Sequence, residues 1–361
     1  MTSFNSIAKS IELIRQHQAN TGAYIASPAY IHYGYSWLRD GTFIAYAMDC
    51  AREHDSALRY YEWCKEIVLR YELKARNVIA QVTTKETVPG ANEFLHTRYT
   101  VDGEEVAGEW GNFQLDGYGA WLWGICQHMK LTGRFELASS FRQAMELTVD
   151  YLTACWALPN YDCWEEFGDL VHPATLAAIY GGLHAVAAYL PERSEQIEQV
   201  CKEIKQFVMT YGVVDGHFIK SIGRRDIDSS LLWVSLPFAL VDVDDPIMKK
   251  TVRLIEQELH QAGGVHRYSQ DTYYGGGQWI LLTAWLGWYY VKTGEREKAQ
   301  EILTWIERKY TKAGLPEQVQ DHLLSPKDYP LWVKQAGEPA NPLLWSHAMY
   351  MVLVAELALI Q

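Results

Sequence analysis

Acidic side chains stand beside aromatic ones at several places in this sequence of 361 residues. Glu165 and Glu166 directly follow Trp164, and Asp40 comes shortly after Trp37. Flat apolar ring faces and charged hydrogen-bond acceptors are the groups that a sugar-binding pocket needs. Two carboxylates that flank a sugar acetal are also the usual catalysts of its hydrolysis. The residue types therefore indicate hydrolysis of a glycoside.

Other catalytic chemistries lack their sequence motifs. The histidines show no H-x-x-x-H spacing with a carboxylate partner, and the six cysteines form no C-x-x-C pair, so the sequence predicts no metal site. It contains neither the G-x-S-x-G turn of serine hydrolases nor a P-loop. The glycine run at 275–277 follows no predicted strand and is a weak candidate for binding phosphate. We therefore expect no metal and no cofactor.

The composition narrows the possible partners. The formal net charge is −12, and an acidic chain repels nucleic acid and anionic lipid. No uninterrupted apolar run reaches the ~18 residues of a membrane-spanning helix. Residues 1–18 alternate apolar and polar side chains, unlike a secretory signal peptide, and scattered cysteines are typical of free thiols in a reducing compartment. We expect no nucleic acid partner, no membrane partner and a cytoplasmic location.

Catalytic groups are held in place by secondary structure, and the hydrophobic periodicity predicts α-helices over most of the chain. We expect twelve helices, at residues 4–18, 41–53, 56–72, 115–131, 134–154, 172–189, 193–210, 229–240, 246–261, 277–293, 295–310 and 342–360. The odd-numbered helices are amphipathic. The even-numbered helices are almost uncharged, since no Asp, Glu, Lys or Arg occurs in residues 41–48, 118–129, 173–190, 231–241, 279–291 or 343–355. A helix that is apolar all round is buried all round.

Half-exposed helices that alternate strictly with uncharged ones indicate two concentric rings. The sequence thus predicts an all-α protein, an (α/α)6 barrel of six helix pairs, as a single catalytic domain over residues 1–361. A flat solenoid would leave one flank of its helices exposed and would not need every second helix to be uncharged. Residues 94–110 alternate with period two around Asp102 and Gly103, which predicts a small β-hairpin insertion.

Clusters of charged residues, most of them with a tryptophan or tyrosine, precede each predicted inner helix. Inner helices of such a barrel run parallel, so the clusters should meet at one end of the ring and form one pocket. Acidic residues also favour helix N-termini as caps, but capping does not explain the accompanying tryptophans and tyrosines. The clusters are residues 37–40, 110–116, 161–166, 224–228, 267–278, and 315–318 together with 342–345.

Within these clusters the sequence resembles glycoside hydrolase family 15, the glucoamylase family. Residues 35–40 (YSWLRD) are similar to its aromatic-x-W-x-R-D segment, 161–166 (YDCWEE) to its Y-D-x-W-E-E motif, and 267–279 to its R-Y…D-T-Y-Y-x-G-x-x-W segment. Residues 114–119 (QLDGYG), 316–318 (PEQ) and 342–348 (PLLWSHA) match further family segments in the same order. The resemblance covers nearly the whole chain, from Tyr33 to Met349, and implies an (α/α)6 barrel.

The resemblance also implies a role for the matched residues. Glu165 is the expected general acid and Glu317 the expected general base of an inverting exo-α-glucosidase without a cofactor. Its substrate would be a short α-linked gluco-oligosaccharide, cut at an α-1,4 or α-1,6 bond at the non-reducing end with release of β-glucose. The expected substrate-binding residues are Trp37, Arg39, Asp40, Asp116, Trp164, Glu166, Arg267, Asp271, Tyr273, Trp279 and Trp345.

Several alternatives stay open. The family also contains trehalases, so trehalose is an alternative substrate. A catalytically silent glucan-sensing protein on the same fold is another, although such a protein would usually have lost one of the two glutamates. A metal-dependent toroid would need a ligand cluster that this sequence lacks. The sequence shows neither the β-sandwich domain of many bacterial family members nor a starch-binding module, which favours short soluble glucosides as substrates.

Overall fold

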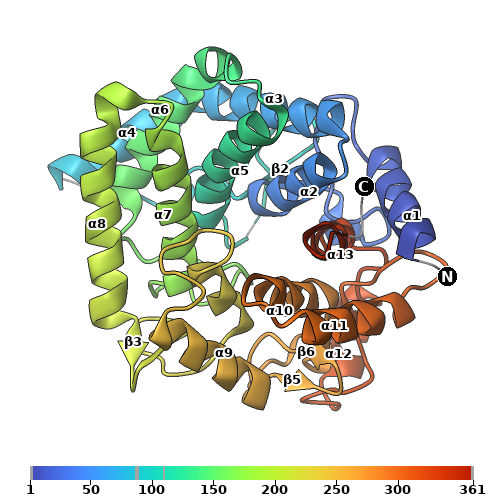
Figure 1. The fold of residues 1–361 in the computed structure, drawn as a ribbon. Helices are drawn as coiled ribbons and strands as arrows, with labels where there is room; N and C mark the ends of the chain where they lie inside the picture. Colours follow the sequence, from blue (N-terminus) through green and yellow to red (C-terminus); the bar gives the residue numbers. More distant parts are fainter. Residues whose placement is uncertain (1–2, 86–88, 109, 359–361) are drawn as a thin grey trace.

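Two concentric rings of helices form the protein (Figure 1). The computed structural model describes residues 3–85, 89–108 and 110–358. The inner ring consists of α2 (Leu38–Cys50), α5 (Asp116–Thr132), α7 (Pro173–Ala187), the 3-10 helix η3 (Ser229–Val234), α10 (Ile280–Lys292) and α13 (Leu344–Glu356). Each of these contacts the next along the chain, and α13 contacts α2, which closes the ring. The predicted (α/α)6 barrel is therefore confirmed.

Amphipathic helices form the outer ring. They are α1 (Ser3–Gln16), α3 (His54–Arg70), α6 (Leu137–Cys155), α8 (Ser194–Tyr211), α9 (Pro246–Glu258) and α11 (Arg296–Arg308). In α8, for example, Ile197, Val200 and Ile204 are buried, whereas Glu195 and Glu198 are exposed. The apolar stripes pack on the inner ring, because α1 contacts α13, α3 contacts α2, and α11 contacts α10.

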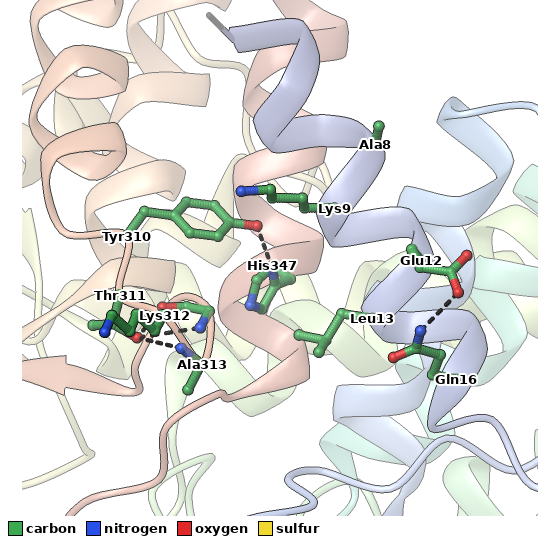
Figure 2. A pocket seen from close by; sticks show the side chains of 11 residues that line it. Ala8, Lys9, Glu12, Leu13, Gln16, Tyr310, Thr311, Lys312, Ala313 and His347 are labelled. Carbon is green, nitrogen blue, oxygen red and sulfur yellow. Dashed lines mark hydrogen bonds between the residues drawn. The ribbon is translucent and has the colours of Figure 1, made fainter. Parts of the chain in front are cut away.

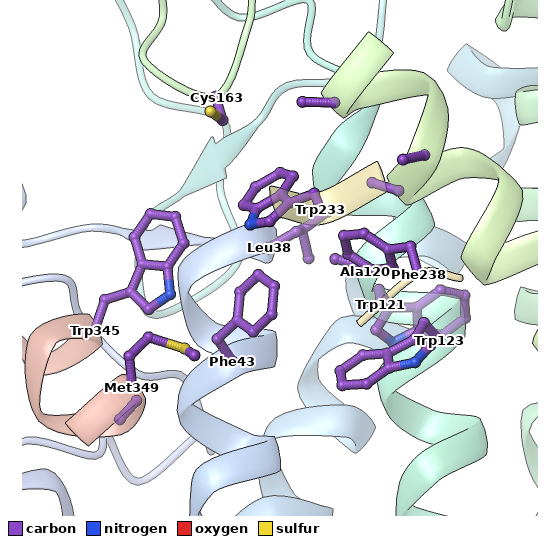
Figure 3. Packing of buried hydrophobic residues seen from close by; sticks show 14 of the residues in the cluster. Leu38, Phe43, Ala120, Trp121, Trp123, Cys163, Trp233, Phe238, Trp345 and Met349 are labelled. Atoms are coloured by element: carbon purple, nitrogen blue, oxygen red, sulfur yellow. The ribbon is translucent and has the colours of Figure 1, made fainter. Parts of the chain in front are cut away.

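Aromatic side chains fill the centre of the inner ring (Figure 3). Phe43 of α2 stacks on Trp345 of α13 with ring centroids 5.7 Å apart, and it meets Trp285 of α10 edge-on at 5.1 Å. Trp233 of η3 lies 5.2 Å from Trp285 and 5.7 Å from Phe43. Aromatic pairs in such geometries stabilise a core beyond the area that they bury. These four rings, called here the aromatic plug, close the barrel at its centre.

Three helical elements differ most from the expectation. The helix α4 (Glu72–Thr84) occupies a stretch where no helix was predicted beyond residue 72, and it packs on α6. The inner helix expected at 229–240 is wrong in length and type, because η3 ends at Val234 and Pro237, which has no N–H to donate, follows. The short helix α12 (Tyr329–Ala336) was not predicted at all, since eight residues are too few to show a period.

Short antiparallel strands bring loops together at one end of the ring. One sheet has the order β5 (His260–Gln261), β6 (Gly264–Val265), β7 (Gln278–Trp279) and β8 (Gln318–Val319). The helix predicted from residue 277 therefore begins only at Ile280, after a strand. Trp279 pairs with Gln318, which places the segment around residue 317 beside the start of α10. Other short elements are β3 (Val213–Val214), β4 (His217–Phe218), η1 (Ile31–Tyr33), η2 (Pro191–Arg193) and η4 (Tyr273–Gly275).

The hairpin expected near residues 94–110 is present in reduced form. The Gly103 N–H donates to the Thr100 carbonyl at 2.9 Å, and Tyr99 forms an isolated bridge with Glu105. The strand β2 (Arg98–Tyr99) also pairs with β1 (Ser36–Trp37), which ties this insertion to the start of α2. Residue 109 lies outside the described residues. Among the described helices, none combines the length and the apolar character needed to cross a membrane.

Candidate active site

A pocket opens where the inner helices begin, as the sequence predicted. Its cavity measures about 570 Å³. All predicted site residues line it except Asp116 and Asp271, which lie behind its wall. The cluster at 224–228 does not reach it either. The lining includes Trp37, Arg39, Asp40, Trp164, Glu165, Glu166, Arg267, Tyr273, Trp279, Glu317 and Trp345.

A second cavity, of about 690 Å³, lies outside the barrel between α1 and the loop 310–314 (Figure 2). Its acidic residue, Glu12, accepts a hydrogen bond from Gln16 at 2.7 Å. His347 accepts the Leu315 N–H through Nε2 at 2.8 Å, and burial lowers the pKa of His347 to about 3, so this ring is a neutral structural link. The described lining residues include no pair of carboxylates, and the active site therefore belongs to the smaller pocket.

Glu165 lies on a tight turn between α6 and α7. Its backbone φ of +66° is in the left-handed region, which residues other than glycine seldom adopt. The carboxylate of Asp162 closes this turn, because its Oδ1 accepts the N–H groups of Trp164 and Glu166 at 3.0 and 2.9 Å. The Glu165 N–H also donates to the Asp162 carbonyl at 2.9 Å. The turn thus presents two consecutive glutamates to the pocket.

One oxygen fixes the carboxyl group of Glu165. Its Oε1 accepts Trp37 Nε1–H at 2.6 Å and Gln114 Nε2–H at 3.1 Å, while Oε2 makes no hydrogen bond to any described residue. Gln114 accepts Arg39 Nη1–H at 2.8 Å through its own oxygen. This amide therefore connects the expected acid with an expected sugar-binding arginine, a role that a motif match alone did not reveal.

Glu317 precedes β8 and is only 1% exposed. Its N–H donates to the Ala340 carbonyl at 2.8 Å, and its own carbonyl accepts the Ile280 N–H at 3.3 Å. The side-chain Oε1 accepts the Tyr33 hydroxyl at 2.9 Å, while Oε2 is buried and has no partner among the described residues. Burial raises the pKa of Glu317 to about 8, because a carboxylate away from water loses its solvation.

Tyr33 is a site residue that the sequence analysis missed. Its hydroxyl lies 3.0 Å from the Tyr273 hydroxyl and donates to Glu317. Its ring meets Trp37 edge-on with centroids 5.7 Å apart, and Trp37 in turn donates to Glu165. Trp37 and Tyr33 thus stand between the two glutamates. The family resemblance begins at Tyr33 but gave this residue no role, because η1 is a single turn and Tyr33 is one of 23 tyrosines.

Arg39 and Asp40 occupy the first turn of α2. Arg39 Nη1 donates to Asp116 Oδ2 at 3.0 Å, and its Nε lies 3.3 Å from Asp40 Oδ1. The Arg39 guanidinium also lies 5.5 Å from the centre of the Trp345 ring. Burial raises the pKa of Asp40 to about 7, although Arg39 opposes the shift. Asp116 is fully buried, and it orients Arg39 from behind the wall.

Arg267, like Arg39, lines the pocket and is held by a buried aspartate behind the pocket wall. Its Nε and Nη2 donate to the two carboxylate oxygens of Asp271 at 2.7 and 2.5 Å. Nη2 also donates to Glu166 Oε1 at 3.3 Å, and the Tyr268 hydroxyl donates to Glu166 Oε2 at 2.6 Å. Burial raises the pKa of Glu166, although Arg267 opposes the shift. Asp271 therefore orients Arg267, which meets Glu166 at the pocket.

Aromatic rings form the walls of the pocket. Trp164 and Trp279 lie side by side with centroids 5.6 Å apart. Trp110, which the sequence analysis did not single out, also lines the pocket and stacks on the Arg98 guanidinium at 3.6 Å. Flat apolar faces with charged groups between them are the expected surroundings of a sugar ring.

The outer edge of the pocket comes from α12, which the sequence did not predict. Trp332 and Gln335 line the pocket. The Trp332 ring lies 4.9 Å from that of Tyr273, and the Tyr274 hydroxyl donates to the Gly337 carbonyl at 2.8 Å. These contacts fix α12 beside the opening.

Carboxyl groups are the reactive groups that this pocket offers. The described residues include no cluster of three or more His, Cys, Asp or Glu side chains that could hold a metal ion. Glu165 and Glu317 approach from different loops and each keeps one oxygen without a hydrogen bond to a described residue. Paired carboxyl groups in an aromatic pocket on this barrel define a glycoside hydrolase.

Comparison with known proteins gives the family. Residues 4–323 match the model of the glycosyl hydrolases family 15, and the chain belongs to this family. It is 41% identical over 354 residues to the isomaltose glucohydrolase of Kribbella flavida, an alignment that covers 96% of this chain and 91% of that protein. The predicted family and enzyme class are confirmed, and the predicted exo-acting α-glucosidase is supported.

More distant relatives and solved structures agree with this placement. Trehalase 1 of Sulfolobus acidocaldarius is 28% identical over 298 residues, which cover 75% of this chain and only 48% of the trehalase. A glycosidase variant solved in complex with glucose superimposes with a TM-score of 0.96 at 40% identity, covering 99% of this chain and 98% of that one. A bacterial glucoamylase with acarbose, at 19% identity and a TM-score of 0.75 over 97% of this chain and 55% of that chain, shares the fold.

Proposed function

We propose that the protein is an inverting exo-α-glucosidase that hydrolyses isomaltose and similarly short α-linked glucosides. The observation that carries this proposal is the presence of Glu165 and Glu317 in one aromatic pocket. The identity to the isomaltose glucohydrolase over nearly the whole of both chains supports the choice of substrate.

Each glutamate has a defined part in the proposed reaction. Glu317 takes a proton from the water that attacks the anomeric carbon, through the Oε2 atom that has no partner among the described residues. The bond from that carbon to the glycosidic oxygen breaks, and its electron pair stays on this oxygen, which receives the proton of Glu165. Attack opposite to the leaving group inverts the configuration, so that an α-glucoside yields β-glucose.

The closed end of the pocket supports exo action. Trp345 belongs both to the pocket lining and to the aromatic plug, where it stacks on Phe43 (Figure 3). A chain cannot pass through the plug, so only a terminal sugar fits beside Arg39, Asp40 and Arg267. Charged groups held by buried partners are well suited to bind the hydroxyls of this sugar, because they need no rearrangement.

The helix α12 supports a short substrate. Trp332 and Gln335 narrow the outer part of the pocket, where the second sugar would lie. The family model ends at residue 323, before α12, whereas the alignment with the isomaltose glucohydrolase covers 96% of the chain. A cavity of about 570 Å³ is within the usual range for a ligand of disaccharide size.

Product analysis tests the proposal. The protein is incubated with isomaltose, maltose, trehalose and isomaltotetraose, and early products are followed by NMR. We expect isomaltose to react fastest, with the glucose from its non-reducing end appearing first as the β-anomer. Release of the non-reducing-end glucose as the α-anomer would reveal a covalent intermediate. Trehalose as the best substrate would make the protein a trehalase, and binding without turnover would make it a sensor.

A further inference from the structure

The turn that carries Glu165 has an unfavourable backbone. Both Glu165 and Phe167 have positive φ, at +66° and +52°. A residue other than glycine in this region costs about 1 kcal/mol or more, and it persists only where the surroundings hold it in place. The contacts behind the turn therefore decide where the carboxyl group of Glu165 lies.

A buried lysine occupies the space behind this turn. Lys220 follows β4 and is 3% exposed. Its Nζ lies 2.5 Å from Asp228 Oδ2 and 3.1 Å from Asp162 Oδ2. The ammonium group also lies 4.0 Å from the centre of the Tyr268 ring. One cation thus joins two carboxylates that come from different loops.

The same two carboxylates hold the catalytic turn. Asp162 uses its other oxygen to accept the N–H groups of Trp164 and Glu166. Asp228 accepts the indole N–H of Trp164 at 3.1 and 3.0 Å. The turn is therefore bound through its backbone by one aspartate and through its tryptophan by the other, and Lys220 links the two.

Charge balance makes Lys220 the central member of this group. Asp162 and Asp228 are 5% and 0% exposed, and two buried carboxylates that share a site repel each other unless a cation lies between them. Although burial alone would lower it, the carboxylates of Asp228 and Asp162 raise the pKa of Lys220 above its usual value. The lysine is therefore charged at every pH at which the enzyme would work.

We propose that Lys220 is a positioning residue for general acid catalysis, which acts through Asp162 and Asp228 to hold Glu165 at the glycosidic oxygen. This inference rests on the proposed role of Glu165. It assigns Lys220 no contact with the substrate. Its loss should slow the step in which Glu165 gives up its proton, and it should affect the rest of the reaction much less.

A pair of substrates separates this role from a general structural one. Isomaltose needs protonation of its leaving oxygen, whereas fluoride leaves α-glucosyl fluoride with little help from an acid. In Lys220→Met we expect kcat for isomaltose to fall by roughly 10- to 100-fold, since a small misplacement of a catalytic group has such an effect, while kcat for α-glucosyl fluoride falls by less than about three-fold. Lys249→Met is the matched control, because Lys249 forms an exposed pair with Asp244 on the surface.

A second variant guards against misfolding. The double variant K220M/D228N removes one positive and one negative charge together, and it should show the same preference for the fluoride. Thermal unfolding and tryptophan fluorescence check that each variant is folded. Equal losses on both substrates, or failure of both variants to fold, would overturn the proposal, because Lys220 would then have only a structural role. Full activity on isomaltose would also overturn it, because Lys220 would then have no role in catalysis.

Glu165→Gln measured in parallel separates this inference from the function on which it rests. If Glu165→Gln keeps more activity on α-glucosyl fluoride than on isomaltose but the Lys220 variants do not, the proposed role of Lys220 is wrong and the assignment of Glu165 as the acid is retained. If Glu165→Gln shows no such preference, the assignment of the acid itself is wrong.

Discussion

The two glutamates of the pocket are held by different kinds of contact. Glu165 sits on a turn that is tied to a buried ion cluster of Asp162, Lys220 and Asp228. Glu317 lies beside a strand, and its side chain meets a tyrosine hydroxyl. Charge fixes the position of the first, whereas burial sets the proton affinity of the second.

This difference separates the two requirements of the reaction: the position of the proton donor and the pKa of the base. A proton donor must lie close to one particular oxygen, and ion pairs in a buried site hold a turn in one geometry. A base must be ionised when the water attacks, and burial opposes this by raising the pKa of Glu317 to about 8. The Tyr33 hydroxyl counteracts burial, because a hydrogen bond to a carboxylate favours its charged form.

The largest effect should come from removing the proton donor. Glu165→Gln keeps the shape of the side chain, and we expect kcat for isomaltose to fall by ~10²–10⁴-fold, the usual contribution of general acid catalysis. The fall should be much smaller for α-glucosyl fluoride. If Glu317→Gln showed the preference for the fluoride instead, the roles of the two glutamates would be reversed.

The pH profile should report the burial of Glu317. Below its pKa of about 8 the carboxyl group keeps its proton and cannot accept another, so kcat/KM should rise on the order of 10²-fold between pH 6 and pH 9. This rise should appear with α-glucosyl fluoride, which isolates the base, because isomaltose also needs a protonated acid for its leaving oxygen. A profile that is flat over this range would contradict the assignment of Glu317 as the base.

Removing one hydroxyl should have a smaller effect. Tyr33→Phe deletes the hydrogen bond to Glu317 Oε1, and hydrogen bonds to charged groups are worth about 1.5–3 kcal/mol. We expect kcat/KM at pH 7 to fall by roughly 10-fold and the rise with pH to move to higher pH. A loss that is the same at every pH would show that Tyr33 does not act on the ionisation of Glu317.

The smallest effect should be on stability. The pKa of Glu317 is about 8 in the folded protein against 4.5 for an ordinary glutamate, so between these values the unfolded chain releases a proton that the folded protein keeps. The free energy of unfolding therefore falls progressively as the pH rises from 4.5 to about 8 and stays low above it, whereas below pH 4.5 this group has no effect. Glu317→Gln should therefore be more stable than the wild type at pH 9, by on the order of 2 kcal/mol or a few degrees.

Thermal unfolding at pH 5 and pH 9 checks this prediction. Little difference is expected at pH 5. Glu258→Gln, a change at an exposed position of α9, is the matched control and should alter neither value. A wild type that is at least as stable as Glu317→Gln at pH 9 would show that the burial of Glu317 does not strain the fold.

The sequence predicts well those features that depend on many residues. Uncharged helices at regular intervals are sufficient to predict the inner ring, and ordered motifs identify Glu165, Glu317 and most of the pocket. Tyr33, Gln114 and Lys220 escape prediction because each acts through side-chain contacts between loops that are distant in the sequence. The length of η3 and the presence of α12 depend on a proline and on tertiary packing, which leave no periodic pattern.

The aromatic plug also dictates the order in which molecules come and go. With Phe43, Trp233, Trp285 and Trp345 closing the barrel, the mouth is at once entrance and exit. If a chain end binds there as we propose, the sugar nearer the mouth has to depart before the glucose beneath it, so we expect glucose to be the last product released and to compete directly with the next substrate. In that case every cleavage ends in a complete exchange of the pocket's contents, and a substrate longer than a disaccharide has to dissociate before its next bond is cut.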